Sequence, residues 1–198
     1  MGLTVHYHLS APAETDATGI HTLVHQLRQS ALGFKRRGRL VTVGPLEQDA
    51  AGLRSARTWP RIRSRYRPDC HLDIEVSPLE GCVFWVDPGD NCESMLLGLC
   101  RYPPTVRAEE SLRRTNLRGW RLHSFCKTQY ASLHGWGHFR RCHTAVIDLL
   151  LAAQRVGFTV EISDEGDYWP GRNLRALRES IGMADAASAG AEALPAPA

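Results

Sequence analysis

The residues best suited to chemistry gather around a single lysine in the stretch SFCKTQYAS, residues 124–132. Of the 24 lysines and arginines in the chain, only Lys35 and Lys127 are lysine. Lysine carries a compact ammonium whose pKa shifts on burial, whereas arginine carries a rigid fork that stays charged. Where arginine is the usual cation, Lys127 indicates a position that needs the shape or the chemistry of lysine.

Two carboxylates near the C-terminal end, Asp164 and Glu165, are candidate partners of Lys127. In one interpretation the pair is catalytic, because a carboxylate can position or deprotonate the ammonium. In the other it is an ordinary ion pair that joins two adjacent strand ends. His143 is a further candidate. It lies on the apolar stripe of a predicted helix, either as a general base or as a core histidine with a hydrogen-bonded ring.

Aromatic and amide side chains in the same segments are suited to hold a planar ligand by stacking and hydrogen bonding. These residues are Gln129, Tyr130, Tyr168 and Trp169. The start of the predicted helix would add a partial positive charge and free backbone N–H groups, which suit an anion. The alternative is that these side chains only cap the edge of a sheet.

A metal site is the next hypothesis, because His134, His138 and Cys142 follow one another at intervals of four residues. On one continuous helix this spacing places all three on one face. The Gly135-Trp136-Gly137 break, however, indicates that His134 precedes the helix, and the chain has no HExxH or CxxC pattern. We therefore expect no metal, and the sequence names no cofactor.

The segment RTWPRIRSRYRP predicts a different class of function, which is binding to nucleic acid or to an acidic partner. Alternate arginines of an extended strand project from one face, where they would follow phosphates while a tryptophan stacks on a base. The residues of this interface, within Arg54 to Arg67, are Trp59, Arg61, Arg63, Arg65 and Arg67. A formal net charge of only +3 counts against it. The alternative is a solvated arm or a strand edge protected by its charge.

Two strand-helix-strand units, at residues 3–46 and 121–163, flank a central region in the predicted secondary structure. Apolar spacing predicts their helices from about residue 18 and over residues 137–157. Between them, the segments CHLDIEVS, GCVFWVD and SMLLGLCRY predict a three-stranded meander. Residues 48–69 are interpreted mostly as loop, and the run after Pro104 as a short helix. The pattern predicts an α+β protein with helices on a mostly antiparallel sheet and suggests ferredoxin-like halves.

This topology places the candidate residues together. In a right-handed crossover the two strands are parallel, so they end at the edge of the sheet where the connecting helix begins. Residues 126–132, 134–143 and 163–169 should therefore meet at one edge.

Length and composition predict one domain over residues 1–183, and an Ala/Pro-rich tail, 184–198, with the composition of a disordered segment. The start lacks the basic and apolar regions of a secretory signal, and no apolar run is long enough for a bilayer span. We therefore expect a cytoplasmic protein that uses no membrane. The six cysteines lack paired CxxC spacing, which favours free thiols.

The segments SFCKTQYAS, RRCHTAVIDLL and SDEGDYW together resemble the C-terminal third of an uncharacterised bacterial protein family. This resemblance implies a bacterial source and implies no activity. From the residues themselves, the favoured function is binding of a small anionic ligand at the edge formed by residues 126–143 and 163–169. Whether a reaction follows, and in which oligomeric state, is left open, and the alternative is the non-catalytic interface within Arg54 to Arg67.

Overall fold

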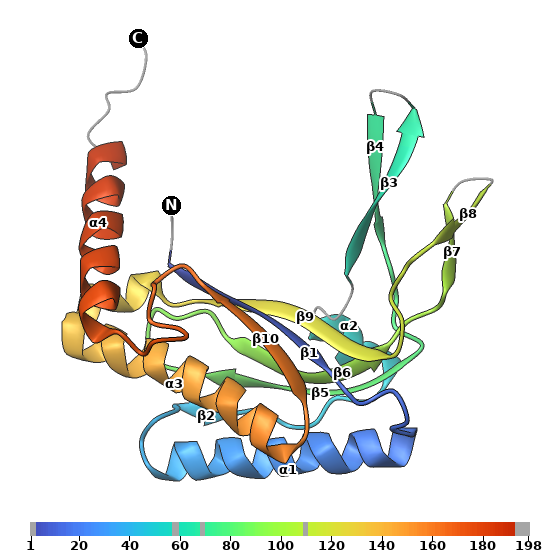
Figure 1. Cartoon of the computed structure of the whole chain (residues 1–198), viewed down its shortest axis with the longest axis horizontal. Coiled ribbons are helices and arrows are strands. Elements are labelled where there is room, and N and C mark those ends of the chain that lie inside the picture. The colour runs from blue at the N-terminus through green and yellow to red at the C-terminus, as the bar shows by residue number, and fades with distance from the viewer. Residues whose placement is uncertain (1–2, 57–59, 68–69, 109–110, 193–198) are drawn as a thin grey trace.

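The computed structural model describes residues 3–56, 60–67, 70–108 and 111–192. Its centre is a six-stranded sheet with the order β10-β1-β9-β6-β5-β2 (Figure 1). The strands are β1 (Thr4–Ser10), β2 (Thr42–Val43), β5 (Glu80–Asp87), β6 (Met95–Arg101), β9 (Trp120–Lys127) and β10 (Thr159–Asp164). Each neighbouring pair is antiparallel. The predicted α+β class with a mostly antiparallel sheet is confirmed.

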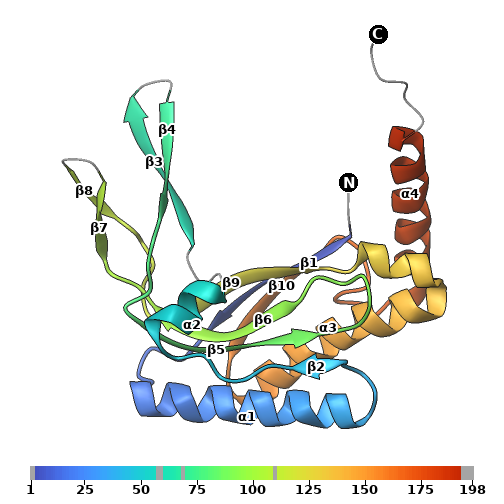
Figure 2. The ribbon, with the colours of Figure 1, turned by 180° about the vertical axis from the view of Figure 1, so that it is seen from behind.

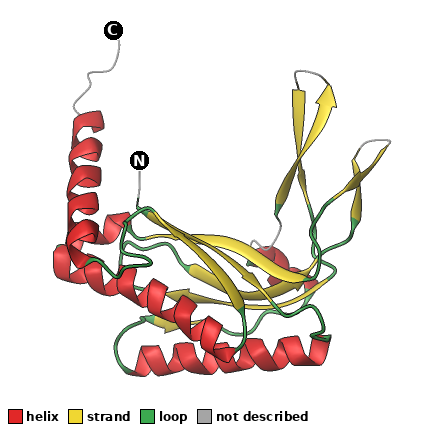
Figure 3. Cartoon of the chain, in the orientation of Figure 1, coloured by secondary structure: helices red, strands yellow, loops and turns green. Residues whose placement is uncertain are grey.

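Two long helices, α1 (Ala17–Arg36) and α3 (Trp136–Val156), cover one face of this sheet (Figures 1 and 3). The Asp16 side chain caps α1 by accepting from the Gly19 N–H at 2.8 Å. Gly157 ends α3 in the left-handed conformation, with φ 111°, that glycine adopts without strain. Both helices bury an apolar stripe, such as Ile20 and Val24 on α1. This side is called the covered face below.

The opposite side of the sheet is called the open face. It is covered only in part, by the short helix α2 (Ala50–Ser55), whose Leu53 packs against Val83 and Cys100. Two hairpins rise beyond one end of the sheet, and α4 (Leu174–Glu192) projects from the other end (Figures 1 and 2). Among the described residues no helix combines the length and the apolar character needed to cross a membrane.

The two strand-helix-strand units are present as predicted. Strands β9 and β10 are each antiparallel to β1 and therefore parallel to each other. They are not adjacent, because β1 lies between them, so α3 crosses over one strand. A 3₁₀ helix, η1 (Gln129–His134), joins β9 to α3.

The predicted meander is only partly correct. Strands β5 and β6 pair as expected, but β4 (Cys70–Glu75) forms a separate hairpin with β3 (Arg61–Arg67). Strand β3 lies within the segment interpreted as loop. In this hairpin Arg61 lies across from Glu75 and forms an ion pair with it, and such a cross-strand pair favours the register.

The short helix predicted after Pro104 is wrong, because this segment forms a hairpin of β7 (Thr105–Ala108) and β8 (Ser111–Arg114). A run this short gains little as an isolated helix, since helix nucleation is costly. At the C-terminal end, α4 continues to Glu192, into the segment whose composition predicts disorder.

Candidate functional site

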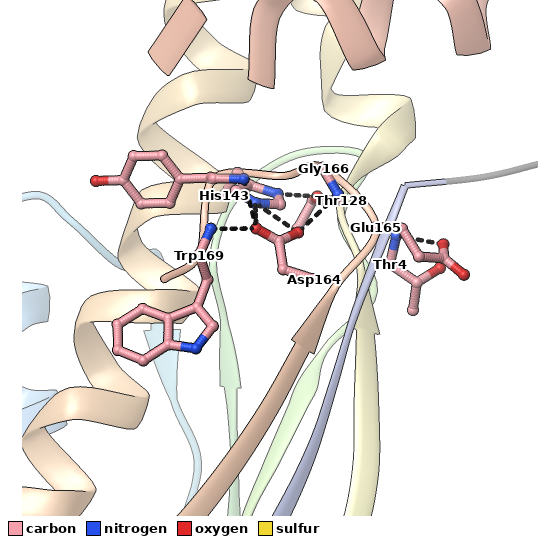
Figure 4. Close-up of polar contacts among 8 residues, drawn as sticks. Thr4, Thr128, His143, Asp164, Glu165, Gly166 and Trp169 are labelled. Carbon is pink, nitrogen blue, oxygen red and sulfur yellow. Dashed lines mark hydrogen bonds and ion pairs between the residues drawn. The ribbon is translucent and has the colours of Figure 1, made fainter. Parts of the chain in front are cut away.

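The end of the sheet where β9 and β10 finish brings the predicted segments together. Three side chains meet on the covered face: Thr128 after β9, His143 on α3 and Asp164 at the end of β10 (Figure 4). The Thr128 Oγ1 lies 2.9 Å from the His143 Nδ1. The His143 Nε2 lies 3.2 Å from one Asp164 oxygen and 3.3 Å from the other. We call these three residues the buried trio.

Asp164 is the centre of a wider hydrogen-bond set. Its carboxylate accepts from the backbone N–H groups of Gly166, Tyr168 and Trp169 at 2.8 to 3.0 Å (Figure 4). Burial raises the pKa of Asp164, but the hydrogen bond and charge of His143 and these backbone N–H groups outweigh it. The pKa therefore lies below the ordinary value. The carboxylate stays ionised and fixes the loop after β10.

The order hydroxyl, imidazole, carboxylate is the arrangement used for nucleophilic catalysis. Here the Thr128 residue and the side chains of His143 and Asp164 are all 0 % exposed. In this structure no substrate reaches the hydroxyl. The geometry supports a hydrogen-bonded tie between three segments, and the catalytic roles of His143 and Asp164 stay predictions that this burial opposes.

Lys127 points to the open face, away from the buried trio. Its Nζ lies 3.4 Å from the Tyr130 hydroxyl and 4.7 Å from the centre of that ring. In the described part of the chain no ion pair joins Lys127 to Asp164 or to Glu165. Both predicted forms of that pair, catalytic couple and structural ion pair, are therefore missing from the structure.

The carboxylates around Lys127 are engaged elsewhere. Glu165 accepts from the Thr4 N–H at 3.0 Å (Figure 4), and its other oxygen lies 3.6 Å from the His6 Nε2. Glu93 accepts from the backbone N–H of Lys127 at 3.3 Å. Lys127 and Glu165 thus flank Thr4 from the two neighbouring strands, with separate partners. We call Lys127, Tyr130, Glu165, His6 and Phe125 the open-face cluster.

An imidazole-rich surface continues from this cluster along β1 and β9. His6 lies 5.9 Å from Phe125 and His8 lies 6.5 Å from His123, between ring centres. Burial, together with the nearby His8 and His6, lowers the pKa of His123 below its ordinary value. The His123 ring therefore loses its proton at a lower pH than an ordinary histidine.

The four predicted ligand-holding residues separate in the structure. Tyr130 is half exposed beside Lys127. Gln129 and Tyr168 are buried, and the Tyr168 ring stands edge-on to His143 at 6.0 Å. Trp169 is partly buried against the core. Only Tyr130 therefore stands where a ligand on the open face would meet it.

The histidines of the metal hypothesis lie near one another. As predicted, His134 ends η1 before α3 begins, and its ring lies 5.0 Å from that of His138. Within the described residues, no three His, Cys, Asp or Glu side chains are arranged to hold a metal ion.

The arginine segment is described only in part. Trp59 lies outside the described residues, as do the side chains of Arg63, Arg65 and Arg67. Arg61 donates to Glu75 at 3.0 Å across the β3–β4 hairpin. For Arg61 this pairing agrees with the alternative interpretation of the segment, a strand edge protected by its charge. The nucleic-acid role of the segment stays a prediction.

The sequence analysis missed Thr128, Glu93 and His6. The alternation of side chains along a strand could have identified Thr128 and His6. Thr128 shares a face with Leu122 and Cys126, and His6 shares the other face with Lys127. Glu93 gave no such signal, because it lies at the end of the β5–β6 turn.

Comparison with known proteins identifies no family for this chain: no family model matches it, and no curated protein or solved structure shows significant similarity.

Proposed function

We propose that the open-face cluster binds a small anionic ligand and that Lys127 supplies the charge that holds it. The observation behind this proposal is the position of the Lys127 ammonium. It rests over the Tyr130 ring, while Glu165 and Glu93 contact other groups. Among the described residues no carboxylate forms an ion pair with this ammonium, which leaves it available to an incoming anion.

Tyr130 supports the proposal by holding Lys127 in one place. A cation over an aromatic face gains about 0.5–1 kcal/mol at an exposed site. The ammonium has three N–H donors, and the Tyr130 hydroxyl takes one of them. The other two are directed at solvent or at ligand oxygens, so that binding costs little ordering of the lysine.

Phe125 and Glu165 indicate what else the ligand carries. Phe125 lies two residues before Lys127 on β9 and is 51 % exposed, so its ring is a wall on the same face. Glu165, held by Thr4 across β1, is a fixed acceptor. The matching ligand has a phosphate or carboxylate, a planar group and a hydrogen-bond donor. We also propose that the protein is bacterial and acts in the cytoplasm.

The two lysines provide a matched test. Thermal unfolding is measured with inorganic phosphate, nucleoside monophosphates, aromatic carboxylates and a short oligonucleotide. A ligand at one hundred times its Kd adds about 2.7 kcal/mol, or several degrees in Tm for a chain of this length. We expect one small anion to raise Tm, Lys127→Met to abolish the shift, and Lys35→Met, on the exposed last turn of α1, to keep it.

Lysine acetylation followed by mass spectrometry gives an independent measurement. The bound anion should protect Lys127 and leave Lys35 unchanged. Equal protection of both lysines, or a full Tm shift in Lys127→Met, would contradict the proposal. A salt-sensitive shift with the oligonucleotide alone would favour the arginine segment instead.

A further inference from the structure

The β5–β6 turn, residues 87–93, packs against the first turns of α3, on the covered side of the sheet. His138 contacts the Asp90 carbonyl at 3.0 Å, and the Cys142 Sγ lies 3.4 Å from the Pro88 carbonyl. The turn approaches so closely that a Cβ at Gly89 would lie 2.7 Å from the Cys142 Sγ. Cys92, at the end of this turn, is thereby brought to Cys142 on the helix.

Two thiols meet at this contact. The Cys92 N–H donates to the carbonyl of Gly89 at 3.0 Å, and Gly89 lies against the Cys142 Sγ, so the two free thiols are close enough to interact. Cys142 is buried, whereas Cys92 is partly exposed at the surface. Solvent therefore reaches Cys92 in part, whereas Cys142 is closed to it.

His138 is held in one tautomer beside the pair. Arg141 can only donate, so its 2.8 Å contact with the His138 Nδ1 requires that this nitrogen accept. In the neutral ring the proton is then on Nε2, which donates to the Asp90 carbonyl and also lies 3.5 Å from the Cys142 Sγ. The ring thus presents an N–H to the sulfur.

The surroundings favour the thiolate of Cys142. The hydrogen bond from Cys92 lowers its pKa, burial acts in the opposite direction, and His138 and Arg141 lower it further, to about 7. The hydrogen bond with Cys142, burial and the nearby Cys142, Cys126 and Asp87 all raise the pKa of Cys92. Burial and the nearby Glu93, Cys142 and Asp87 likewise raise the pKa of Cys126. The first proton lost by the pair therefore leaves the negative charge on Cys142.

We propose that Cys92 and Cys142 form a reversible redox site, in which a peroxide oxidises Cys92 and the Cys142 thiolate closes a disulfide. The inference is independent of the ligand proposed for the open face. It rests on a thiol pair beside a histidine and an arginine on the covered side, with one cysteine partly buried and the other fully buried.

The chemistry balances with hydrogen peroxide as the oxidant. A pair that has lost one proton carries its negative charge mainly on Cys142 and, in a minor form, on Cys92. In this minor form Cys142 is the thiol, and the Cys92 thiolate attacks one peroxide oxygen and breaks the O–O bond. Cys92 becomes a sulfenic acid, and the released hydroxide takes the proton from Cys142 to form water. The Cys142 thiolate then attacks the sulfenic sulfur, forms the S–S bond and expels hydroxide, which is protonated by solvent. Two thiols are oxidised by two electrons, and a reducing thiol reverses the reaction.

The test follows thiols in the native full-length chain. The protein is treated with hydrogen peroxide at pH 7, its remaining thiols are alkylated after denaturation, and its peptides are mapped by mass spectrometry. We expect a Cys92–Cys142 linked peptide that dithiothreitol removes, while Cys82, buried elsewhere in the core, stays alkylatable. Cys82→Ser is the matched control variant and should form the same linkage at the same rate.

Two further variants separate a redox site from an accidental contact. Cys92→Ser should leave Cys142 unoxidised at peroxide doses that complete the linkage in the unmodified protein. His138→Asn, which keeps a polar group on the exposed start of α3, should slow closure by up to about tenfold, because the thiolate fraction of Cys142 falls toward that of an ordinary thiol. Circular dichroism of each variant establishes that it is folded.

Several results would overturn the proposal. They are the absence of a linked peptide in folded protein, a linkage that joins Cys126 or Cys82 instead, and equal oxidation of Cys142 in Cys92→Ser. If folded His138→Asn formed the disulfide at the rate of the unmodified protein, the histidine would have no role in the site.

Discussion

The two faces of the sheet take neighbouring residues of the same segments and use them in opposite ways. Thr128 and Asp164 face α3 and complete the buried trio, whereas Lys127 and Glu165, one position away, stand on the open face. The trio joins three segments in a closed set of hydrogen bonds. The open-face cluster keeps an ammonium, a carboxylate and three rings in contact with solvent. In the pairs Lys127-Thr128 and Asp164-Glu165, neighbouring side chains point to opposite faces of the sheet. Strand alternation thereby separates a structural tie from a candidate binding site.

The largest expected effect is the loss of the carboxylate at the centre of the trio. Asp164→Ala leaves His143 and three backbone N–H groups without their acceptor, in a place closed to water. Breaking a buried pair of this kind costs about 3–5 kcal/mol of unfolding free energy. Urea denaturation should show a lower midpoint for Asp164→Ala, with Asp164→Asn intermediate because it keeps one acceptor.

Glu165→Gln is the matched control for this comparison. Its side chain is 47 % exposed, and glutamine can still accept from the Thr4 N–H. We expect a change of less than about 1 kcal/mol, as for other exposed pairs. If both variants lost the same stability, the contrast between the two faces would be wrong.

Acid should weaken the tie progressively. The pKa of Asp164 is lower in the folded protein, so its contribution is fully present above the pKa of an unfolded aspartate, about 3.9. It is lost as the pH falls through the folded pKa. The stability difference between the unmodified protein and Asp164→Asn should therefore shrink below about pH 4. Urea midpoints measured from pH 7 down to pH 3 test this, and a difference that stayed constant with pH would contradict it.

The sequence predicted which segments meet better than how their residues pair. Crossover topology brought residues 126–132, 134–143 and 163–169 together, and apolar spacing placed His143 toward the sheet. The expected pairing of Lys127 with Asp164 failed, because period-2 alternation sends these side chains to opposite faces. The contact of the β5–β6 turn with α3 depends on tertiary packing, and neither segment alone carries a signal for it.

The hairpins show the same limit in the fold. The run after Pro104 has helix-forming residues but no apolar stripe, and pairing of β7 with β8 overrides its local preference. Arg61 of β3 pairs with Glu75 of β4, a partner that only the register reveals.

The smallest expected effect lies in that β3–β4 hairpin, and it extends the comparison to a third region. Arg61 and Glu75 are 69 % and 50 % exposed, so water screens their attraction and both side chains lose rotamer freedom on pairing. A double-mutant cycle with Arg61→Gln and Glu75→Gln should give a coupling energy of about 0.2–1 kcal/mol by urea denaturation. A coupling energy comparable to the loss in Asp164→Ala would mean that the hairpin is a second structural tie. If Arg61→Gln instead left stability unchanged but weakened binding to an oligonucleotide, the arginine would act on phosphates, and the nucleic-acid alternative would replace the small anion.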